Sequence, residues 1–249
     1  MKGLFDHGGL FMSVFSRVCL GFTFLLTASQ VKASIVLGGT RIIYPSNQNE
    51  VQITLKNKDA YARYLVQSWV SNIDGSKAPF LITPPVYKLE ENRQTLLHIV
   101  FTGDKNKLPQ DRESLFLANI KSVSAMPEEL KDKNTLQFAM KARLKLFWRP
   151  ASLDNSDALT AWEKLKFHKE AGKLIVKNPT PFYISFSDLT VSGKNIVPTE
   201  SKSEPGALLM MVGPFSEQRF SLPVGAGSIV EWSVITDYGS SSGKRQQKL

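Results

Sequence analysis

One alternating stretch, residues 136–150, limits the possible folds of this chain more than any other segment. It has the sequence LQFAMKARLKLFWRP, and from Leu136 to Leu144 every second residue is apolar. Because successive side chains of a strand point to opposite faces, this spacing predicts one long strand with one apolar face. Pro150 has no N–H for a sheet ladder and disfavours a helix just before it, so the strand should end there. Most strands of this kind simply pack on the core of their own domain.

Short apolar segments separated by turn residues precede this strand, and none of them has a helical period. Such a series is typical of an antiparallel β-sandwich, and residues 34–150 have a suitable length for one domain of this kind. The strands predicted before residue 136 are 34–44, 51–55, 61–70, 80–86, 95–102 and 113–120.

The remaining residues, 151–249, predict a second and smaller β-sandwich after a polar linker at 151–160. Its apolar strands alternate with turns that contain Gly, Pro and Ser. The polar segment 192–206 is expected to form a mobile surface loop, and the basic tail 244–249 is expected to lack a fixed structure. The strands predicted here are 174–176, 182–186, 208–212 and 229–235.

The first 33 residues predict a secretory signal peptide rather than part of the fold. Lys2 and Arg17 precede an apolar run at 18–26, and small residues at 31 and 33 favour cleavage after Ala33. The apolar run is short for a bilayer span, which makes an uncleaved membrane anchor the less favoured alternative. The only cysteine, Cys19, lies in this segment, so the exported chain would carry no disulfide.

Several short motifs are spaced along the two predicted domains. They are TRIIYP at 40–45, TPPV at 83–86, LPQDRESLF at 108–116, KLFWRP at 145–150, NPTPFY at 178–183 and TDYG at 236–239. In this order, and together with the signal peptide and the chain length, they resemble those of the PapD-like periplasmic pilus (fimbrial) chaperones. The short, cysteine-free segment before residue 136 is similar to the short-loop branch of that family.

The resemblance implies both a fold and a function. The implied fold is all-β, with two immunoglobulin-like β-sandwich domains set at an angle and a cleft between them. The implied function is a periplasmic chaperone for fimbrium biogenesis, which binds, folds and caps pilus subunits by donor-strand complementation and delivers them to an outer-membrane usher. A pilus structural subunit or adhesin is the alternative, but subunits lack their own final strand and often carry a disulfide.

Two cations, Arg41 and Lys145, occupy the first and the last predicted strand of the first domain. Matched residue by residue, the resemblance implies that they anchor the C-terminal carboxylate of a pilus subunit in the cleft. Two cations held together favour an anion, and hydrogen bonds between charged groups are the stronger kind. Without the resemblance, two solvated basic side chains would be the simpler interpretation.

The apolar row Leu136, Phe138 and Met140 is expected to complete the core of the bound subunit. The subunit would pair its own strand with an exposed edge of this stretch, so that backbone hydrogen bonds supply affinity and alternate side chains supply fit. Fully burying each apolar side chain contributes about 1.5–3 kcal/mol. Lys145 has the opposite parity to this row, so it should face away from it unless a bulge or twist turns the strand.

A third group, Glu113, Arg149 and Asp237, is implied by the resemblance to form an ion network between the domains. Such a network would fix their relative orientation, because a buried arginine without partners is costly. The alternative is that some of these side chains lie on the surface.

Catalysis has few suitable residues after the signal segment. No cysteine remains, and the histidines His98 and His168 do not have metal-ligand spacing with each other. No phosphate-binding glycine loop or nucleophile elbow is present. We therefore expect no enzyme activity, no metal and no cofactor.

The positive charge of the chain does not point to nucleic acid. The formal net charge is +9, and it is +7 once the three cations and one acid of residues 1–33 are set aside. These charges are spread along the whole chain rather than clustered on one segment.

An exposed apolar strand edge is an aggregation hazard, and the resemblance implies that the free protein masks it by self-association. Whether the Pro84-Pro85 pair contains a cis peptide bond is left open.

Overall fold

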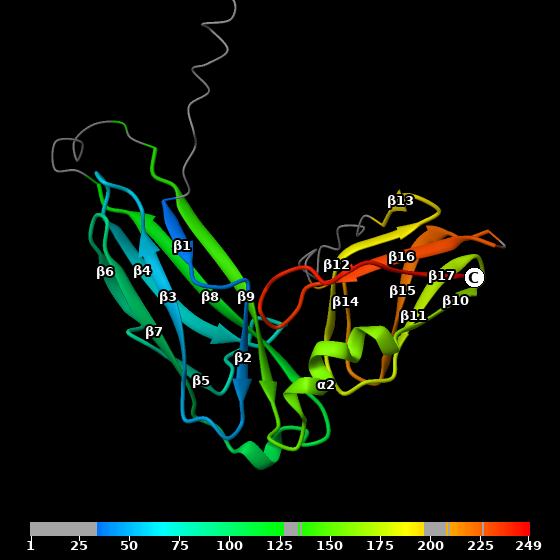
Figure 1. Cartoon of the computed structure of the whole chain (residues 1–249). Coiled ribbons are helices and arrows are strands. Elements are labelled where there is room, and N and C mark those ends of the chain that lie inside the picture. Colours follow the sequence, from blue (N-terminus) through cyan, green and yellow to red (C-terminus); the bar gives the residue numbers. More distant parts are fainter. Residues whose placement is uncertain (1–33, 127–133, 135, 197–207, 209, 226) are drawn as a thin grey trace, which may run out of the picture. The chain divides into compact units, whose positions relative to one another are not determined.

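Two β-sandwiches, each with its own apolar core, make up the part of the chain that the structure describes (Figure 1). This computed structural model describes residues 34–126, 134, 136–196, 208, 210–225 and 227–249, and the predicted signal peptide lies outside them. Residues Ile35–Leu249 form one compact unit. The all-β fold class with two sandwich domains, predicted from the sequence, is confirmed.

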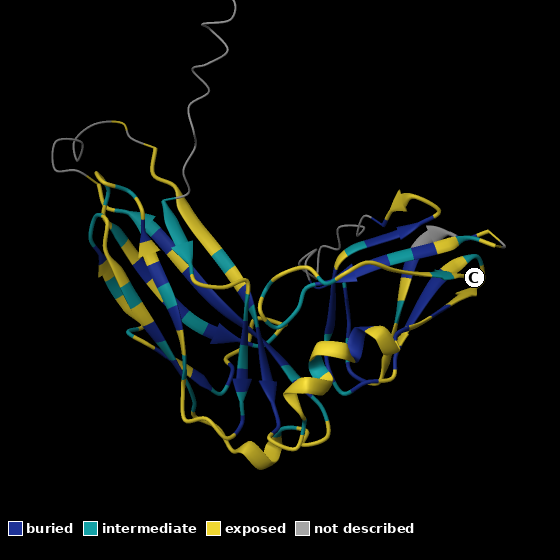
Figure 2. Ribbon diagram, viewed as in Figure 1, coloured by how far each residue is buried: buried dark blue, intermediate teal, exposed yellow. Residues whose placement is uncertain are grey.

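The first sandwich consists of two sheets, with strand orders β1-β3-β7-β5 and β2-β9-β8-β4-β6. Alternating side chains from the two sheets form its core, in which Leu55, Leu97, Leu146 and Trp148 are fully buried. Figure 2 shows buried residues along the strands of both sandwiches. Its elements are β1 (Ile35–Leu37), β2 (Arg41–Pro45), β3 (Val51–Asn57), β4 (Tyr64–Ser71), β5 (Phe80–Thr83), β6 (Val86–Leu89), β7 (Gln94–Phe101), the 3₁₀ turn η1 (Lys105–Lys107), β8 (Ser114–Ser124) and β9 (Ala139–Arg149).

The first predicted strand, 34–44, is divided between the two sheets, and this corrects the sequence prediction. β1 pairs with β3 in one sheet, whereas β2 pairs with β9 in the other. The chain changes sheets at Gly38 and Gly39, where a Cβ on Gly38 would lie 3.1 Å from the Cβ of Thr54. The pairing of β2 with β9 is parallel, so the sandwich is not antiparallel throughout.

β9 begins later than the alternation predicts. The strand starts at Ala139, and residues 136–138 have no strand pairing. The reason is the length of its neighbour, because β8 ends at Ser124 and Ala139 already pairs with Val123. Alternation along one segment cannot show where its partner strand stops.

The second sandwich pairs its strands in the orders β10-β11-β15 and β13-β12-β16-β17, and β14 also pairs with β12. Its core includes Phe167, Leu174, Phe186, Val230 and Trp232. The elements are α2 (Asn155–Thr160), η3 (Ala161–Lys164), β10 (Lys166–Glu170), β11 (Lys173–Asn178), β12 (Ile184–Val191), β13 (Lys194–Asn195), β14 (Met211–Val212), β15 (Ser216–Pro223), β16 (Ile229–Val234) and β17 (Arg245–Lys248).

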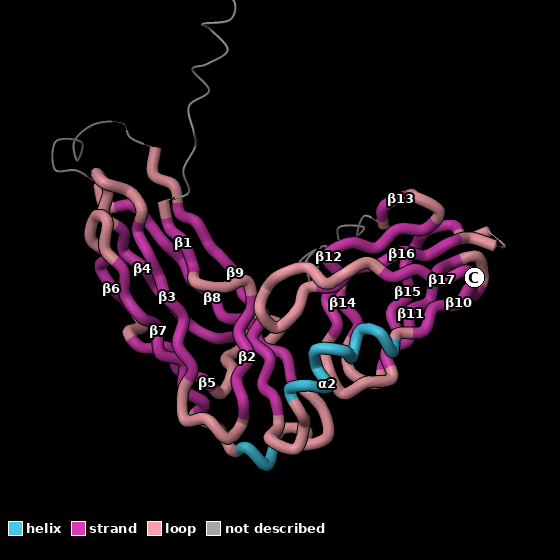
Figure 3. Tube along the Cα trace, viewed as in Figure 1, coloured by secondary structure: helices cyan, strands magenta, loops and turns pink. Residues whose placement is uncertain are grey.

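The polar linker predicted at 151–160 contains a helix, which was not predicted from the sequence. The Asp154 side chain accepts a hydrogen bond from the Ser156 N–H at the start of α2, an N-cap interaction. α2 runs into η3, where Trp162 is buried against the core of the second sandwich. Figure 3 shows how short these helical segments are beside the strands.

The basic tail is ordered, contrary to the prediction that 244–249 has no fixed structure. β17 pairs with β16 over four residue pairs, and the Gln247 side chain donates a 2.9 Å hydrogen bond to the Phe167 carbonyl. Arg245 forms a 2.8 Å ion pair with Glu163, and Leu249 packs against the core. The strand sequence RQQK is too polar for an apolar pattern to reveal it. Most of the predicted loop 192–206 lies outside the described residues.

Other sequence expectations concern single residues. The cis peptide bond precedes Pro84, at Thr83–Pro84. His98 lies on β7, is partly exposed and is 3.1 Å from a Glu50 carboxylate oxygen. Among the described residues, no helix is long and apolar enough to cross a membrane, and no group of three or more His, Cys, Asp or Glu side chains could hold a metal ion.

Candidate functional site

Arg41 and Lys145 are direct neighbours in the parallel pair of β2 and β9. β2 starts at Arg41, and the residue opposite it on β9 is Lys145. Both side chains are half-buried, and the Nε of Arg41 has no hydrogen-bond partner within the described part of the chain. The first and last predicted strands were expected to carry these two cations, and the structure shows the residues as neighbours on parallel strands, a direction that was not foreseen.

The pairing of β9 with β8 shows which face of the sheet carries the Lys145 side chain. The register runs without a bulge from Ala139 to Trp148. Leu144 and Leu146 consequently face the core of the first sandwich, and Lys145 lies on the opposite face together with Phe147. That face is covered by residues of the second sandwich, since Phe147 stacks at 5.6 Å on Tyr183.

Burial makes the charge of Lys145 unfavourable. Its surroundings lower the pKa of the ammonium to about 8, chiefly through loss of water and secondly through the charge of Arg41. Burial also lowers the pKa of the Arg41 guanidinium, against the opposing effects of Asp237 and Glu113. Among the described residues, neither cation forms an ion pair. Two neighbouring, partly dehydrated cations with no acidic partner among the described residues form a site suited to an anion.

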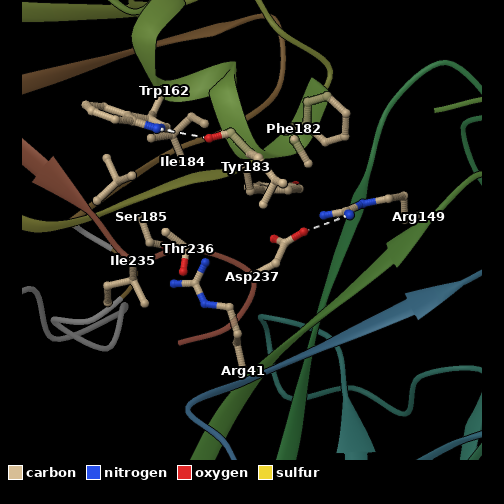
Figure 4. A pocket seen from close by; sticks show the side chains of 13 residues that line it. Arg41, Arg149, Trp162, Phe182, Tyr183, Ile184, Ser185, Ile235, Thr236 and Asp237 are labelled. Carbon is tan, nitrogen blue, oxygen red and sulfur yellow. Dashed lines mark hydrogen bonds and ion pairs between the residues drawn. The ribbon is translucent and has the colours of Figure 1, made fainter. Parts of the chain in front are cut away.

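A pocket opens beside this pair. Figure 4 shows the Arg41 guanidinium directed toward Ser185 and Thr236, with Asp237 on the side of Arg149. The Nζ of Lys145 donates a 3.0 Å hydrogen bond to the Ser185 hydroxyl. Sequence reasoning missed Ser185, because a serine inside an apolar strand carries no recognisable signal.

β9 has one open edge before Lys145. β8 pairs with β9 from Ala139 to Trp148 on one side, whereas β2 covers the other side only from Lys145 onward. No described strand pairs with that side between Ala139 and Leu144. The backbone of this segment is therefore available for one more strand.

The predicted apolar row is exposed at the start of this edge. Leu136, Phe138 and Met140 have exposed fractions of 79%, 70% and 64%, and Figure 2 shows the beginning of β9 as an exposed segment. Leu144, which continues the alternation, is buried in the core. The first three apolar side chains are thus left without a packing surface, and Leu144 already has one.

Arg149 forms ion pairs with both Glu113 and Asp237, and these are the three residues that the resemblance groups together. The Arg149 Nη2 is 2.7 Å from Glu113 Oε1, and its Nη1 is 2.8 Å from Asp237 Oδ2. Nη1 also donates a 2.8 Å hydrogen bond to Asn155 Oδ1, and Glu113 Oε2 accepts one from the Tyr183 N–H at 2.8 Å. Asn155 was missed because it lies in the segment predicted as a linker.

The electrostatics of this cluster depend on its burial. Arg149 and Glu113 are each only 3% exposed. Burial raises the pKa of the Glu113 carboxyl, and the charge of Arg149 and the Tyr183 N–H act in the opposite direction. Each ion is stable at this depth only because the other ion and the polar partners replace its lost water.

The loop that carries Asp237 approaches the start of β2 closely. Gly239 has a φ of +81°, and a Cβ at this position would lie 2.6 Å from the Thr40 hydroxyl oxygen. Only glycine therefore fits this position without moving the residue that precedes Arg41.

Comparison with known proteins places the whole described region in one family. The family model for the N-terminal domain of the PapD pili and flagellar-assembly chaperones matches residues 34–154, and the model for the PapD C-terminal domain matches residues 160–246. The chaperone protein FimC of Escherichia coli K12 is 37% identical over 226 residues, which cover 90% of this chain and 88% of FimC.

Solved structures agree with these matches. The Salmonella enterica structure of the SafA pilin in complex with the SafB chaperone contains a chain 35% identical to this one, with a TM-score of 0.71 and coverage of 88% and 97% of the two chains. The periplasmic chaperone SfaE is 31% identical, with a TM-score of 0.67 and coverage of 85% and 98%. The resemblance read from the motifs is confirmed, and the alternative of a pilus subunit or adhesin is not favoured. This chain belongs to the PapD family of pilus assembly chaperones.

Proposed function

We propose that this chaperone holds a pilus subunit along the open edge of β9 and binds its C-terminal carboxylate with Arg41 and Lys145. The observation that carries this proposal is the junction at Lys145, where the open edge ends, β2 begins and the two cations meet. A strand whose carboxylate lies at this junction and which extends toward Ala139 must run parallel to β9. It would lie end to end with β2 along the same side of β9.

The exposed apolar row would then insert into the subunit. Met140 is five residues from Lys145, about 17 Å at the rise of a strand, and Leu136 is about 30 Å away. The carboxylate anchor fixes the register of the paired strands, and Leu136, Phe138 and Met140 supply apolar surface to the incomplete core of the subunit. We infer that this binding needs no nucleotide or other cofactor.

The Arg149 cluster would serve a different purpose. Its residues come from the first sandwich, from α2 and from the loop after β16. We infer that it holds the two sandwiches in a fixed orientation, so that the second sandwich closes the anion pocket beside Arg41. The cluster would therefore act on subunit binding indirectly.

Location and delivery belong to the same proposal. SfaE, one of the relatives, is a periplasmic chaperone, and another is found in complex with a pilin. We infer that residues 1–33 direct this chain to the periplasm and are removed there, and that an outer-membrane usher receives the chaperone–subunit complex. In the absence of a subunit, the open edge of β9 would be available for pairing with a second copy of the chain.

Replacing Leu136, Phe138 and Met140 together by serine tests the proposed donor row. Each side chain is exposed in the free protein, so the free energy of unfolding should change by less than about 1 kcal/mol. Affinity for a candidate pilus subunit should fall at least about a hundredfold, because burying each side chain contributes about 1.5–3 kcal/mol. The measurement is co-purification of the subunit from periplasm, followed by titration of the purified complex.

The matched control replaces Leu81 and Leu96 by serine, since these exposed leucines lie in the sheet that does not contain β9. The control variant should bind the subunit like the wild type. If the donor-row variant also binds like the wild type, the apolar row does not complete the subunit and this part of the proposal is wrong.

A further inference from the structure

The ammonium of Lys145 is held by one residue of the second sandwich, Ser185. The Lys145 Nζ lies 3.0 Å from the Ser185 Oγ. Ser185 is buried and belongs to β12, where it pairs with Met211 and its carbonyl accepts a 2.8 Å hydrogen bond from the Ile235 N–H. The backbone pairing of the second sandwich therefore fixes the position of this hydroxyl.

The other groups around Lys145 do not compensate its charge. β2 contributes the cation Arg41, and β8 contributes the apolar Leu117 as register partner. The nearest acidic residues of the pocket act on the neighbouring cations, since Asp237 forms its ion pair with Arg149 and opposes the lowering of the pKa of Arg41. Within the described part of the chain, the Ser185 hydroxyl is the one hydrogen-bond acceptor of the Lys145 ammonium.

A hydroxyl differs from a carboxylate in the way that matters for anion binding. It accepts a hydrogen bond from the ammonium and thereby favours the charged form. It carries no negative charge, so it does not neutralise the site or compete with an incoming anion. An aspartate at the same position would form a permanent ion pair with Lys145.

We propose that Ser185 is a positioning residue for Lys145, which holds the charged ammonium next to Arg41, where the carboxylate of the subunit binds. This inference rests on the proposed carboxylate anchor and adds a residue from the second sandwich to it. The two sandwiches would then form the anion site jointly.

Binding of the carboxylate should depend on pH. Only the charged ammonium attracts a carboxylate, so affinity should be nearly constant at pH values more than about one unit below 8 and should fall as Lys145, with its pKa of about 8, loses its proton. Removing the hydroxyl removes a hydrogen bond to a charged group, which lowers the pKa of Lys145 further. The decline in affinity should then begin about one pH unit lower.

The test uses a synthetic peptide with the C-terminal strand sequence of a candidate pilus subunit and a free carboxylate. Its affinity is measured between pH 6 and pH 9.5 for the wild type, Ser185→Ala, Ser185→Thr and Ser185→Asp. The matched control is Ser187→Ala, because Ser187 lies on the same strand but its hydroxyl contacts Ser233 and Ser241. In parallel, the pKa of Lys145 is measured in each free protein from the NMR shift of its ε carbon.

We expect the affinity of Ser185→Ala for the peptide to be within about threefold of the wild-type affinity at pH 6. As the pH is raised, its affinity should begin to fall at a pH about one unit lower than for the wild type. Ser185→Thr should restore the wild-type profile, and Ser187→Ala should not change it. Ser185→Asp should raise the pKa of Lys145 and lower the affinity at least about tenfold at pH 7, since its own carboxylate occupies the site.

Three results would overturn the inference. The first is that Ser185→Ala has the same pKa of Lys145 and the same pH profile of binding as the wild type. The second is that Ser185→Asp binds the peptide as tightly as the wild type. The third is that Ser185→Ala loses affinity by the same factor at every pH. Lys145→Ala separates this failure from failure of the proposed function. If Lys145→Ala loses the peptide, the carboxylate anchor stands without Ser185, and if it binds the peptide like the wild type, the anchor itself is wrong.

Discussion

Replacing Arg149 by alanine is expected to lower the free energy of unfolding by about 3–5 kcal/mol, because it leaves the buried Glu113 carboxylate without its counter-ion. Asp237 and Asn155 lose their partner in the same variant. The measurement is urea denaturation at pH 7, followed by tryptophan fluorescence and by circular dichroism so that separate unfolding of the two sandwiches would be detected.

The pH dependence of the same variant gives a second test. Without Arg149, the pKa of Glu113 in the folded protein should rise further above its unfolded value, because burial is no longer opposed by a positive charge. A carboxyl with a raised folded pKa destabilises the fold at high pH, so the lost stability should return in part as the pH falls through that pKa. Adding Glu113→Gln should likewise recover part of the loss at pH 7.

The control for Arg149 is Arg219→Ala, which removes an exposed ion pair with Glu170. Exposed pairs contribute about 0–1 kcal/mol, so this variant should stay close to the wild type. If Arg149→Ala is no less stable than Arg219→Ala, the buried cluster does not contribute to the free energy of unfolding and this prediction is wrong.

Replacing Lys145 by methionine is expected to stabilise the free protein and to abolish its function. Burial lowers the pKa of Lys145 to about 8, so the charged side chain opposes folding at pH 7. Removing that charge should raise the free energy of unfolding by about 3 kcal/mol, because the pKa is lowered from 10.5 to about 8 and each unit corresponds to about 1.4 kcal/mol. Affinity for a pilus subunit should fall at least about a hundredfold, because one of the two carboxylate donors is lost.

The sign of the pH effect follows from the lowered pKa. Between pH 8 and about pH 10, the unfolded wild-type chain keeps the proton of Lys145 and the folded chain does not, so this residue makes stability rise with pH. The methionine variant lacks this rise, and its advantage over the wild type should shrink above pH 8. Lys166→Met, which replaces an exposed lysine on β10, should show neither effect. A Lys145→Met protein that is less stable than the wild type at pH 7 would contradict this account.

The sequence predicted the elements whose evidence is local. Strict alternation over 136–144 predicted most of the strand that became β9, and turn residues predicted the approximate positions of β3, β4, β7 and β8. The predicted strand 80–86 instead ends at Thr83 as β5, and β6 begins at Val86 in the other sheet. The proximity of Arg41 to Lys145 and of Arg149 to Glu113 was implied by the family resemblance and not by a local pattern.

The features that the sequence did not predict depend on partners distant in the chain. β9 starts at Ala139 because β8 ends opposite it, and the tail forms β17 because β16 offers it a partner. The parallel direction of β2 follows from the change of sheet at Gly38. Ser185 reaches Lys145 across 40 residues of sequence, so no local pattern could connect the two.

The most direct test of the central claim is to move the carboxylate of the subunit. A candidate pilus subunit and the same subunit with two glycines added at its C-terminus are each expressed with the chaperone, and complexes are purified from periplasm. The extension moves the carboxylate by about 7 Å, beyond the reach of Arg41 and Lys145 in the same register. We predict a one-to-one complex with the unmodified subunit and none with the extended one. Equal recovery of both complexes would show that the carboxylate does not anchor the subunit, and would contradict the account.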